Sequence, residues 1–211
     1  MSTRDELIDA LGAELAPVRP RNSDIGAMLW LLLAAASVLG LVYFTGPFRP
    51  GFMGQLLAHP RFAIETGAGV VAIVLVALAA GRCSVPGALT PRLATVALAS
   101  AATWVSFYIY GLFDPALEPS MVGKRNHCVF ETFLYGAPAA FAAWLLIRQQ
   151  FTLRPLGAAF LGGLAAGMIP ALYMQLACMY EPLHILVFHI APGVALALAT
   201  LAAVALSLCR G

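Results

Sequence analysis

The chain has 211 residues, of which 61% are hydrophobic and only 10% are charged. Soluble domains carry charge on about a quarter of their residues, so this composition excludes a soluble globular protein and indicates one embedded in a membrane. The net charge of +2 is also too weak for a nucleic-acid-binding surface, which needs a concentrated basic face.

Residues 1–24 are predicted to form a separate N-terminal segment, because they hold eight of the twenty-two charged residues (12 basic plus 10 acidic). Their mixed charge is unlike a secretory signal peptide, so we expect the segment to be retained. Thr3 and Glu6 have the spacing of a capping box, and the residues after them predict an amphipathic helix of about three turns that ends before Pro17. Its apolar stripe consists of Leu7, Ile8, Leu11 and Leu15. A helix this short is marginal in water, so the stripe is expected to lie against the membrane domain or in a groove of a soluble partner.

Residues 25–211 contain six apolar runs, each close to the ~20 residues that cross the hydrocarbon core. The runs are Ile25–Phe44, Phe62–Ala80, Leu93–Phe113, Cys128–Ile147, Leu156–Ala177 and Leu183–Leu208. Backbone groups in lipid must be hydrogen-bonded within their own segment, so the runs are predicted to be helices. The expected fold is an all-α integral membrane protein, a six-helix transmembrane bundle preceded by the short amphipathic helix.

An even number of spans places both termini on one side of the membrane. Basic residues are more numerous on that side, eight against four: Arg4, Arg19, Arg21, Arg82, Arg92, Arg148, Arg154 and Arg210 against Arg49, Arg61, Lys124 and Arg125. An excess of Lys and Arg marks the cytoplasmic face. Both termini are therefore predicted to be cytoplasmic.

The four cysteines form no C-x-x-C motif, which argues against a zinc-ribbon or thioredoxin-type site. The predicted topology places Cys128 and Cys178 at the outer boundary of the membrane, where disulfides persist, and Cys83 and Cys209 at the cytoplasmic boundary, where thiols stay reduced. Cys128 and Cys178 are predicted to be a working pair that forms a disulfide or binds a metal. The other two cysteines are assigned no role.

Four polar side chains are expected near that pair and are candidate metal ligands or supporting groups: His127, Glu131, Glu181 and His184. Glu131 lies one helical turn after Cys128 on the same face, and a carboxylate at that depth is a functional-site hypothesis. Thiolate and imidazole suit zinc, cadmium or copper(I). His189 is five residues after His184, so an α-helix is not expected to present both on one face. The alternative is that these histidines and glutamates are solvated groups at the membrane interface.

Several features of the chain occur together in one known family. They are the opening stretches Leu7–Leu11 and Leu15–Arg19, the order of the six spans, Cys128 at the outer start of the fourth span, and Cys178 followed by Glu181 and Pro182. In these features the chain resembles the NrsF family of bacterial anti-sigma factors, the negative regulators of sigma F, over nearly its whole length. Family members commonly have Cys-Pro-Glu in the last outer loop and Trp-Tyr-Gly in the sixth helix, where this chain reads Cys178-Met179-Tyr180-Glu181 and Phe188-His189-Ile190.

The resemblance implies a non-enzymatic protein of the bacterial inner membrane that binds an extracytoplasmic-function sigma factor and makes no direct contact with nucleic acid. It assigns sigma-factor binding to the N-terminal segment, through Leu7, Ile8, Leu11 and Leu15. It assigns the sensing of heavy metal or oxidant to Cys128 and Cys178, with release of the sigma factor as the response. No cofactor is expected to be required, although a soft metal ion can bind transiently at the two cysteines.

The residues also allow two other functions, a transporter and an enzyme. A small transporter for a metal or thiol-reactive ion would use Glu65, Glu131 and His189 as polar steps, but transporter folds often show inverted repeats, which are not evident here. A membrane thiol oxidoreductase would need a second redox pair of the C-x-x-C kind, which the chain lacks. The anti-sigma factor is therefore the favoured prediction.

Overall fold

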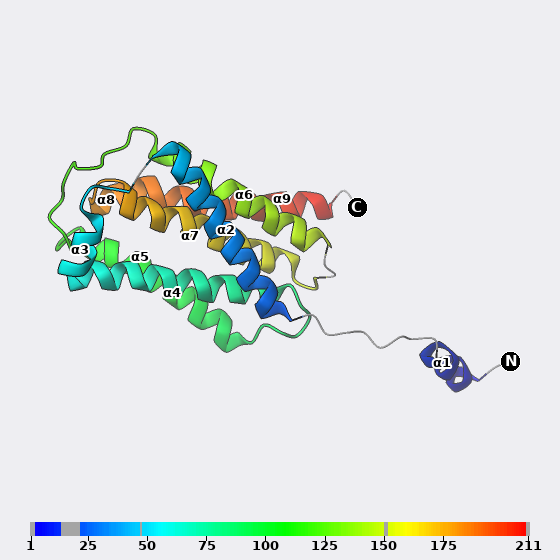
Figure 1. Cartoon of the computed structure of the whole chain (residues 1–211). Helices are drawn as coiled ribbons and strands as arrows, with labels where there is room; N and C mark the ends of the chain where they lie inside the picture. Colours follow the sequence, from blue (N-terminus) through cyan, green and yellow to red (C-terminus); the bar gives the residue numbers. More distant parts are fainter. Residues whose placement is uncertain (1–2, 14–21, 47, 150–151, 210–211) are drawn as a thin grey trace.

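The computed structural model describes residues 3–13, 22–46, 48–149 and 152–209. Within these residues the chain forms α-helices and one π-helix (Figure 1). The elements are α1 (Arg4–Ala13), α2 (Ser23–Thr45), α3 (Phe52–Ala58), α4 (Pro60–Cys83), α5 (Pro91–Gly111), α6 (Cys128–Gln149), α7 (Pro155–Ala177), α8 (Pro182–Ile185), η1 (Leu186–Ile190) and α9 (Ala191–Leu208).

The described part of the chain has six helical segments long and apolar enough to cross a membrane. They are α2, α4, α5, α6, α7 and the continuous segment Pro182–Leu208, which joins α8, η1 and α9. Their ends lie within three residues of the predicted ones, so the predicted fold class is confirmed. Proline begins α4, α5, α7 and α8, because its fixed φ suits the first helical position and its missing N–H has no partner there.

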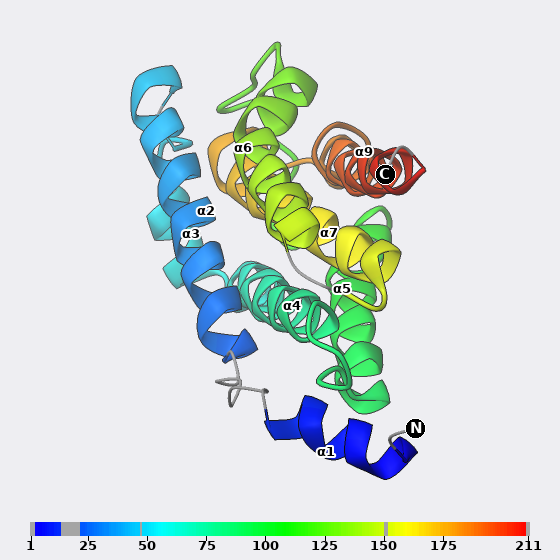
Figure 2. The same cartoon turned by 90° about the vertical axis from the view of Figure 1, so that its right-hand side faces the viewer.

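Helix α7 is the centre of the bundle. Of its most apolar 18-residue stretch, 78% is buried, the largest share among the six spans. Figures 1 and 2 show α4, α6 and α9 arranged around it, with α2 lying across α4 and α6 and α5 beside α4. The residues that α7 presents on every side are mostly Ala, Gly, Leu and Met, which allows several helices to approach it closely.

The closest approach joins α7 to α9 at Gly167 and Gly193. A Cβ atom added to Gly193 would lie 2.7 Å from the Gly167 carbonyl oxygen, and one added to Gly167 would collide with the backbone of Gly193. One turn earlier, a Cβ on Gly163 would meet the Cα of Ala197 at 2.8 Å. The Gly163-x-x-x-Gly167 motif therefore provides close helix packing.

The bundle has two ends that are used as landmarks below. The cysteine end carries Cys128 and Cys178, and the terminal end carries the start of α2 and the end of α9 (Figure 1). At the terminal end the Asn22 side chain caps α2, and the Asp24 carboxylate forms a salt bridge of 2.7 Å with Arg82 of α4.

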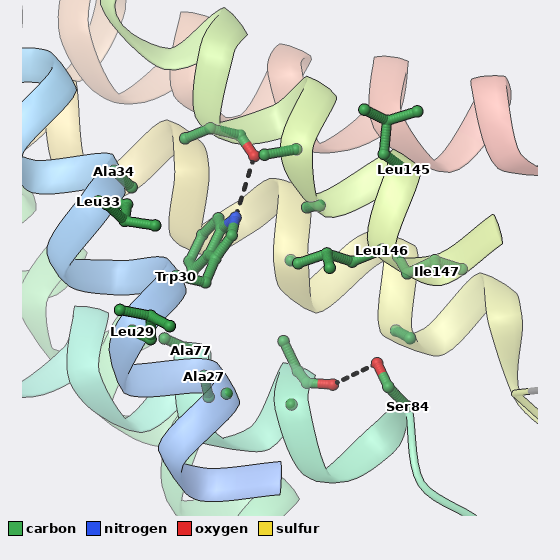
Figure 3. Close-up of a pocket in the computed structure, with 18 of the residues that line it drawn as sticks. Ala27, Leu29, Trp30, Leu33, Ala34, Ala77, Ser84, Leu145, Leu146 and Ile147 are labelled. Atoms are coloured by element: carbon green, nitrogen blue, oxygen red, sulfur yellow. Dashed lines mark hydrogen bonds between the residues drawn. The ribbon is translucent and has the colours of Figure 1, made fainter. Parts of the chain in front are cut away.

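An apolar cavity of about 520 Å³ lies between α2, α4, α6 and α7 in the half of the bundle nearer the terminal end (Figure 3). Leu29, Trp30 and Leu33 of α2 line one side of it, and Leu146 of α6 lines another. The Trp30 indole N–H donates to the Ala139 carbonyl at 3.3 Å. Helix α2 is therefore packed less tightly against its neighbours here than α7 is against α9.

Helix α1 has the predicted capping box. The Thr3 amide donates to the Glu6 carboxylate at 2.7 Å, and the Glu6 amide donates to the Thr3 hydroxyl at 3.4 Å. Leu7, Ile8 and Leu11 are 55%, 54% and 57% exposed, so the membrane domain does not cover them. Leu15, the fourth residue of the predicted stripe, lies outside the described residues.

We expect Gly167→Ala to destabilise the bundle by about 1–3 kcal/mol, because the added methyl group overpacks the α7–α9 contact. The free energy of unfolding of the purified protein in mixed micelles measures this effect. Gly67→Ala in α4 is the matched control, since a Cβ there meets nothing within 4 Å and Ala favours the helix. Equal stability of the two variants would contradict the packing assignment.

Candidate functional site

The structure brings Cys128 and Cys178 together at the cysteine end. Cys128 is the first residue of α6 and Cys178 follows the last residue of α7. Their Sγ atoms are 3.3 Å apart, and both residues are buried, with 4% and 0% of their surface exposed. Both thiols are free. The pair is therefore close enough to react as a unit, either with an oxidant or with a metal ion.

Two histidines of the last span join the sulfur pair. His184 Nε2 lies 3.5 Å from Cys178 Sγ. One ligand atom from each of Cys128, Cys178, His184 and His189 lies within 4.8 Å of the others. Thiolate and imidazole in this number are the ligands of four-coordinate zinc-type sites, so the residues present fit a metal ion.

The approach of His184 and His189 differs from the sequence expectation, and η1 is the reason. In η1 the Ala191 amide donates to the Leu186 carbonyl, five residues earlier. With this pattern, residue i+5 lies much nearer the face of residue i than it does in an α-helix, and the two imidazole rings meet at a centroid distance of 5.0 Å. The expectation that a spacing of five separates them was wrong, because it assumed an uninterrupted α-helix.

Glu181 positions His184 through the backbone. Its carboxylate accepts hydrogen bonds from the Leu183 amide at 3.2 Å and from the His184 amide at 2.6 Å, which makes it the N-cap of α8. The cap fixes the start of the helix that carries His184. Glu181 therefore acts as a capping residue in this arrangement and is not one of the four clustered ligands.

Arg49 holds the turn that carries Cys178. Its Nη1 donates to the Cys178 carbonyl at 2.7 Å, its Nη2 donates to the Gln55 side chain at 2.7 Å, and its backbone amide donates to the Leu176 carbonyl at 3.1 Å. Only 2% of its surface is exposed. Burial lowers the pKa of Arg49, but a guanidinium stays protonated in proteins. Sequence reasoning counted Arg49 only as a loop charge and missed this contact.

His127 and Glu131 lie beside the cluster without entering it. His127 is exposed, and the Glu131 carboxylate accepts from Arg125 Nη1 at 3.1 Å in a half-buried salt bridge. Neither residue belongs to the four clustered ligands. Of the four supporting residues predicted from the sequence, only His184 contributes a clustered ligand atom, and His189, which was not among them, contributes another.

A second buried polar contact, between Glu65 and Tyr180, joins α4 to the turn after α7. Glu65 is completely buried, and its carboxylate accepts from the Tyr180 hydroxyl at 2.9 Å. The same hydroxyl accepts from the Ala116 amide at 3.2 Å, and burial raises the pKa of Tyr180. The Glu65 carboxylate therefore helps to anchor the segment that follows Cys178.

Electrostatics at the sulfur pair favour a thiolate on Cys178. A hydrogen bond from the Cys128 thiol lowers the pKa of Cys178, which burial opposes. The thiolate is the form that attacks oxidants and binds metals. The site therefore combines one activated sulfur, a second thiol in contact with it, and two adjacent imidazoles.

The remaining cysteines are far from this site. Cys83 ends α4 and Cys209 follows α9, so both belong to the terminal end. Cys83 is buried and Cys209 is exposed. Neither contributes to the four-residue cluster.

Comparison with known proteins gives one match. The model of the family described as negative regulator of sigma F, NrsF, matches residues 11–209, which is nearly the whole chain. No curated protein and no solved structure matches it. With six membrane-spanning helices in the expected order, the chain belongs to the NrsF family, the negative regulators of sigma F.

Proposed function

We propose that the protein is a membrane-bound anti-sigma factor that sequesters an extracytoplasmic-function sigma factor through its N-terminal helix and releases it when Cys128 and Cys178 react with an oxidant or a heavy metal. Membership of a family of negative regulators of sigma F supports the regulatory role. The observation that carries the sensing role is the 3.3 Å separation of two buried Sγ atoms from different helices.

The orientation in the membrane follows from charge. The side that carries the chain termini holds eight basic residues in the sequence and the other side holds four, so the terminal end faces the cytoplasm. The cysteine end then faces outward, in the bacterial inner membrane. There the thiols meet oxidants and metals from outside the cell, and a disulfide persists once it has formed.

The N-terminal segment, residues 1–24, is the part that holds the sigma factor. Leu7, Ile8 and Leu11 present an apolar stripe that the membrane domain leaves exposed, and a short helix of this kind gains stability when a hydrophobic groove covers the stripe. Sigma factors are soluble and work in the cytoplasm with RNA polymerase. A helix tethered to the membrane therefore keeps its partner away from the polymerase.

The sensing chemistry needs only the two sulfurs. Starting from the Cys178 thiolate and the Cys128 thiol, oxidation breaks one S–H bond and forms one S–S bond; two electrons pass to the oxidant, such as a peroxide, and one proton is released. The distance between the two Sγ atoms must shorten from 3.3 Å to about 2.05 Å. This change draws the start of α6 and the end of α7 together. A soft metal bound by both thiolates would displace the same two elements.

Arg49 links the sulfurs to α2, the helix that follows the N-terminal segment. Arg49 lies shortly after α2 and binds the Cys178 carbonyl, while the Tyr173 hydroxyl of α7 donates to the Gly46 carbonyl at 3.0 Å. A shift of the Cys178 turn is therefore passed to α2. A hundredfold loss of sigma affinity needs about 2.7 kcal/mol of free-energy difference between the reduced and the oxidised bundle.

The first prediction from the proposed function concerns sigma binding. Leu7→Asp combined with Leu11→Asp should weaken binding at least about a hundredfold, because each buried leucine contributes about 1.5–3 kcal/mol. Co-purification of the sigma factor with the detergent-solubilised protein and a sigma-dependent reporter measure the loss. Ala10→Asp with Ala13→Asp adds the same charge off the stripe and is the control. Full retention of the sigma factor by the double leucine variant would defeat the proposed binding mode.

The second prediction concerns sensing. Cys128→Ser and Cys178→Ser should each abolish induction by oxidant or heavy metal while the sigma factor stays bound, because one sulfur can neither form the disulfide nor complete a dithiolate site. The reporter measures induction, and co-purification measures retention. The control is Cys209→Ser, which changes an exposed cysteine at the terminal end. This variant should respond like the wild type. Normal induction in both serine variants at the site would refute the sensing role.

The third prediction concerns coupling. Arg49→Lys keeps the charge but loses the fork that binds the Cys178 carbonyl and Gln55 together. We expect the induction ratio to fall about tenfold, equivalent to about 1.4 kcal/mol of coupling, while Cys128 and Cys178 still form a disulfide in a non-reducing gel assay. Arg61→Lys, at the exposed salt bridge with Asp114, is the control. Unchanged induction in Arg49→Lys would remove Arg49 from the coupling route.

A further inference from the structure

The four side chains of Cys128, Cys178, His184 and His189, called here the Cys2His2 cluster, have the composition of a complete metal site. Their ligand atoms lie within 4.8 Å of one another. Cys128, Cys178 and His189 are buried and His184 is half-buried. They come from three parts of the chain: the start of α6, the turn after α7, and the α8–η1 segment.

We propose that the Cys2His2 cluster binds one divalent ion of the Zn²⁺ and Cd²⁺ class in tetrahedral geometry, with both histidines as direct ligands. The proposal deepens the sensing role given above and rests on it for its biological meaning. Metal binding itself involves no sigma factor, so it can be measured separately.

Two distances in the cluster are close to those of such an ion, while ligand atoms that lie up to 4.8 Å apart must move closer together when it binds. With Zn–S near 2.3 Å and Zn–N near 2.0–2.1 Å, a tetrahedral site places a sulfur and a nitrogen ligand about 3.6 Å apart and two sulfurs about 3.8 Å apart. The Cys178 Sγ to His184 Nε2 distance is 3.5 Å and the Sγ to Sγ distance is 3.3 Å. The sulfurs need to separate by about half an ångström, a change in the opposite direction to disulfide formation.

His189 points to a ligand independently of these distances. The side chain is completely buried, and neither of its ring nitrogens meets the geometry of a hydrogen bond among the described residues, although one lies within 4.8 Å of Cys178 Sγ. A buried imidazole without partners is unfavourable. A metal ion within the cluster would satisfy one ring nitrogen and account for a π-helix that turns His189 toward His184 and the two sulfurs.

The net charge of the four ligands favours a divalent ion over a singly charged one. Two thiolates and two neutral imidazoles neutralise a doubly charged cation, so the buried complex carries no net charge. A singly charged ion such as copper(I) would leave one negative charge uncompensated in the same place, which is costly where water is excluded. Four protein ligands also close the coordination shell, which is the arrangement of non-catalytic zinc sites.

The test uses Co²⁺ as the probe on the reduced, full-length protein in detergent. We expect one Co²⁺ per chain, with the visible bands of tetrahedral cobalt and a thiolate charge-transfer band, and displacement by Zn²⁺. His189→Phe and His184→Phe should each weaken binding by more than the about 10- to 100-fold that loss of an outer-shell partner costs. The control is His127→Phe, which changes an exposed histidine next to Cys128. This variant should bind Co²⁺ like the wild type.

Retention of the wild-type cobalt spectrum in both His184→Phe and His189→Phe would overturn the proposal, and so would an octahedral spectrum or no binding. Should the variants fail to fold, as judged by gel filtration, X-ray absorption of the Zn²⁺-loaded wild type decides: two sulfurs at about 2.3 Å and two nitrogens at about 2.0 Å support the site, and any other set refutes it. Tetrahedral binding without metal-dependent release of a sigma factor would support the site while counting against the proposed sensing function.

Discussion

The buried guanidinium of Arg49 is the interaction on which the cysteine end depends. The last carbonyls of a helix have no partner within it, and Cys178 lies where α7 ends. Arg49 donates to the Cys178 carbonyl while also binding Gln55. The planar fork of a guanidinium can hold several acceptors at once, and each bond is stronger where water is excluded. The turn that carries Cys178 is therefore fixed to the segment between α2 and α3 as well as to α7.

Helices α7 and α2 differ in how tightly the rest of the bundle holds them. Helix α7 meets α9 at Gly167 and Gly193 with backbone in contact, and a packed contact of that kind deforms little. Helix α2 is held by polar contacts at its two ends, among them the 2.6 Å hydrogen bond between Thr45 and Tyr135. Between these ends it borders a cavity of about 520 Å³, where contact atoms are missing on one side. A rigid α7 beside a less tightly packed α2 is consistent with the proposed coupling, in which a change at the sulfurs shifts α2.

The six spans and the meeting of Cys128 with Cys178 could be predicted from the sequence, because long apolar runs and an even topology determine which residues share a membrane boundary. The contacts of Arg49 could not, since its partners at Cys178 and Leu176 are backbone carbonyls and leave no pattern in the side chains. The position of His189 could not be predicted either, because it depends on a π-helix that the spacing of residues does not reveal.

The last span explains why one local distortion matters for the whole site. In a continuous α-helix a spacing of five residues would turn His189 away from His184, and its imidazole would not be held near the sulfurs. Instead η1 keeps a buried, unpartnered ring beside them. An unmet hydrogen-bonding requirement of this kind costs about 1–3 kcal/mol, and a bound ion is one of the ways in which such a requirement is met. The distortion therefore places His189 beside the sulfurs of the proposed site, to which α6, the turn after α7 and the last span each contribute residues.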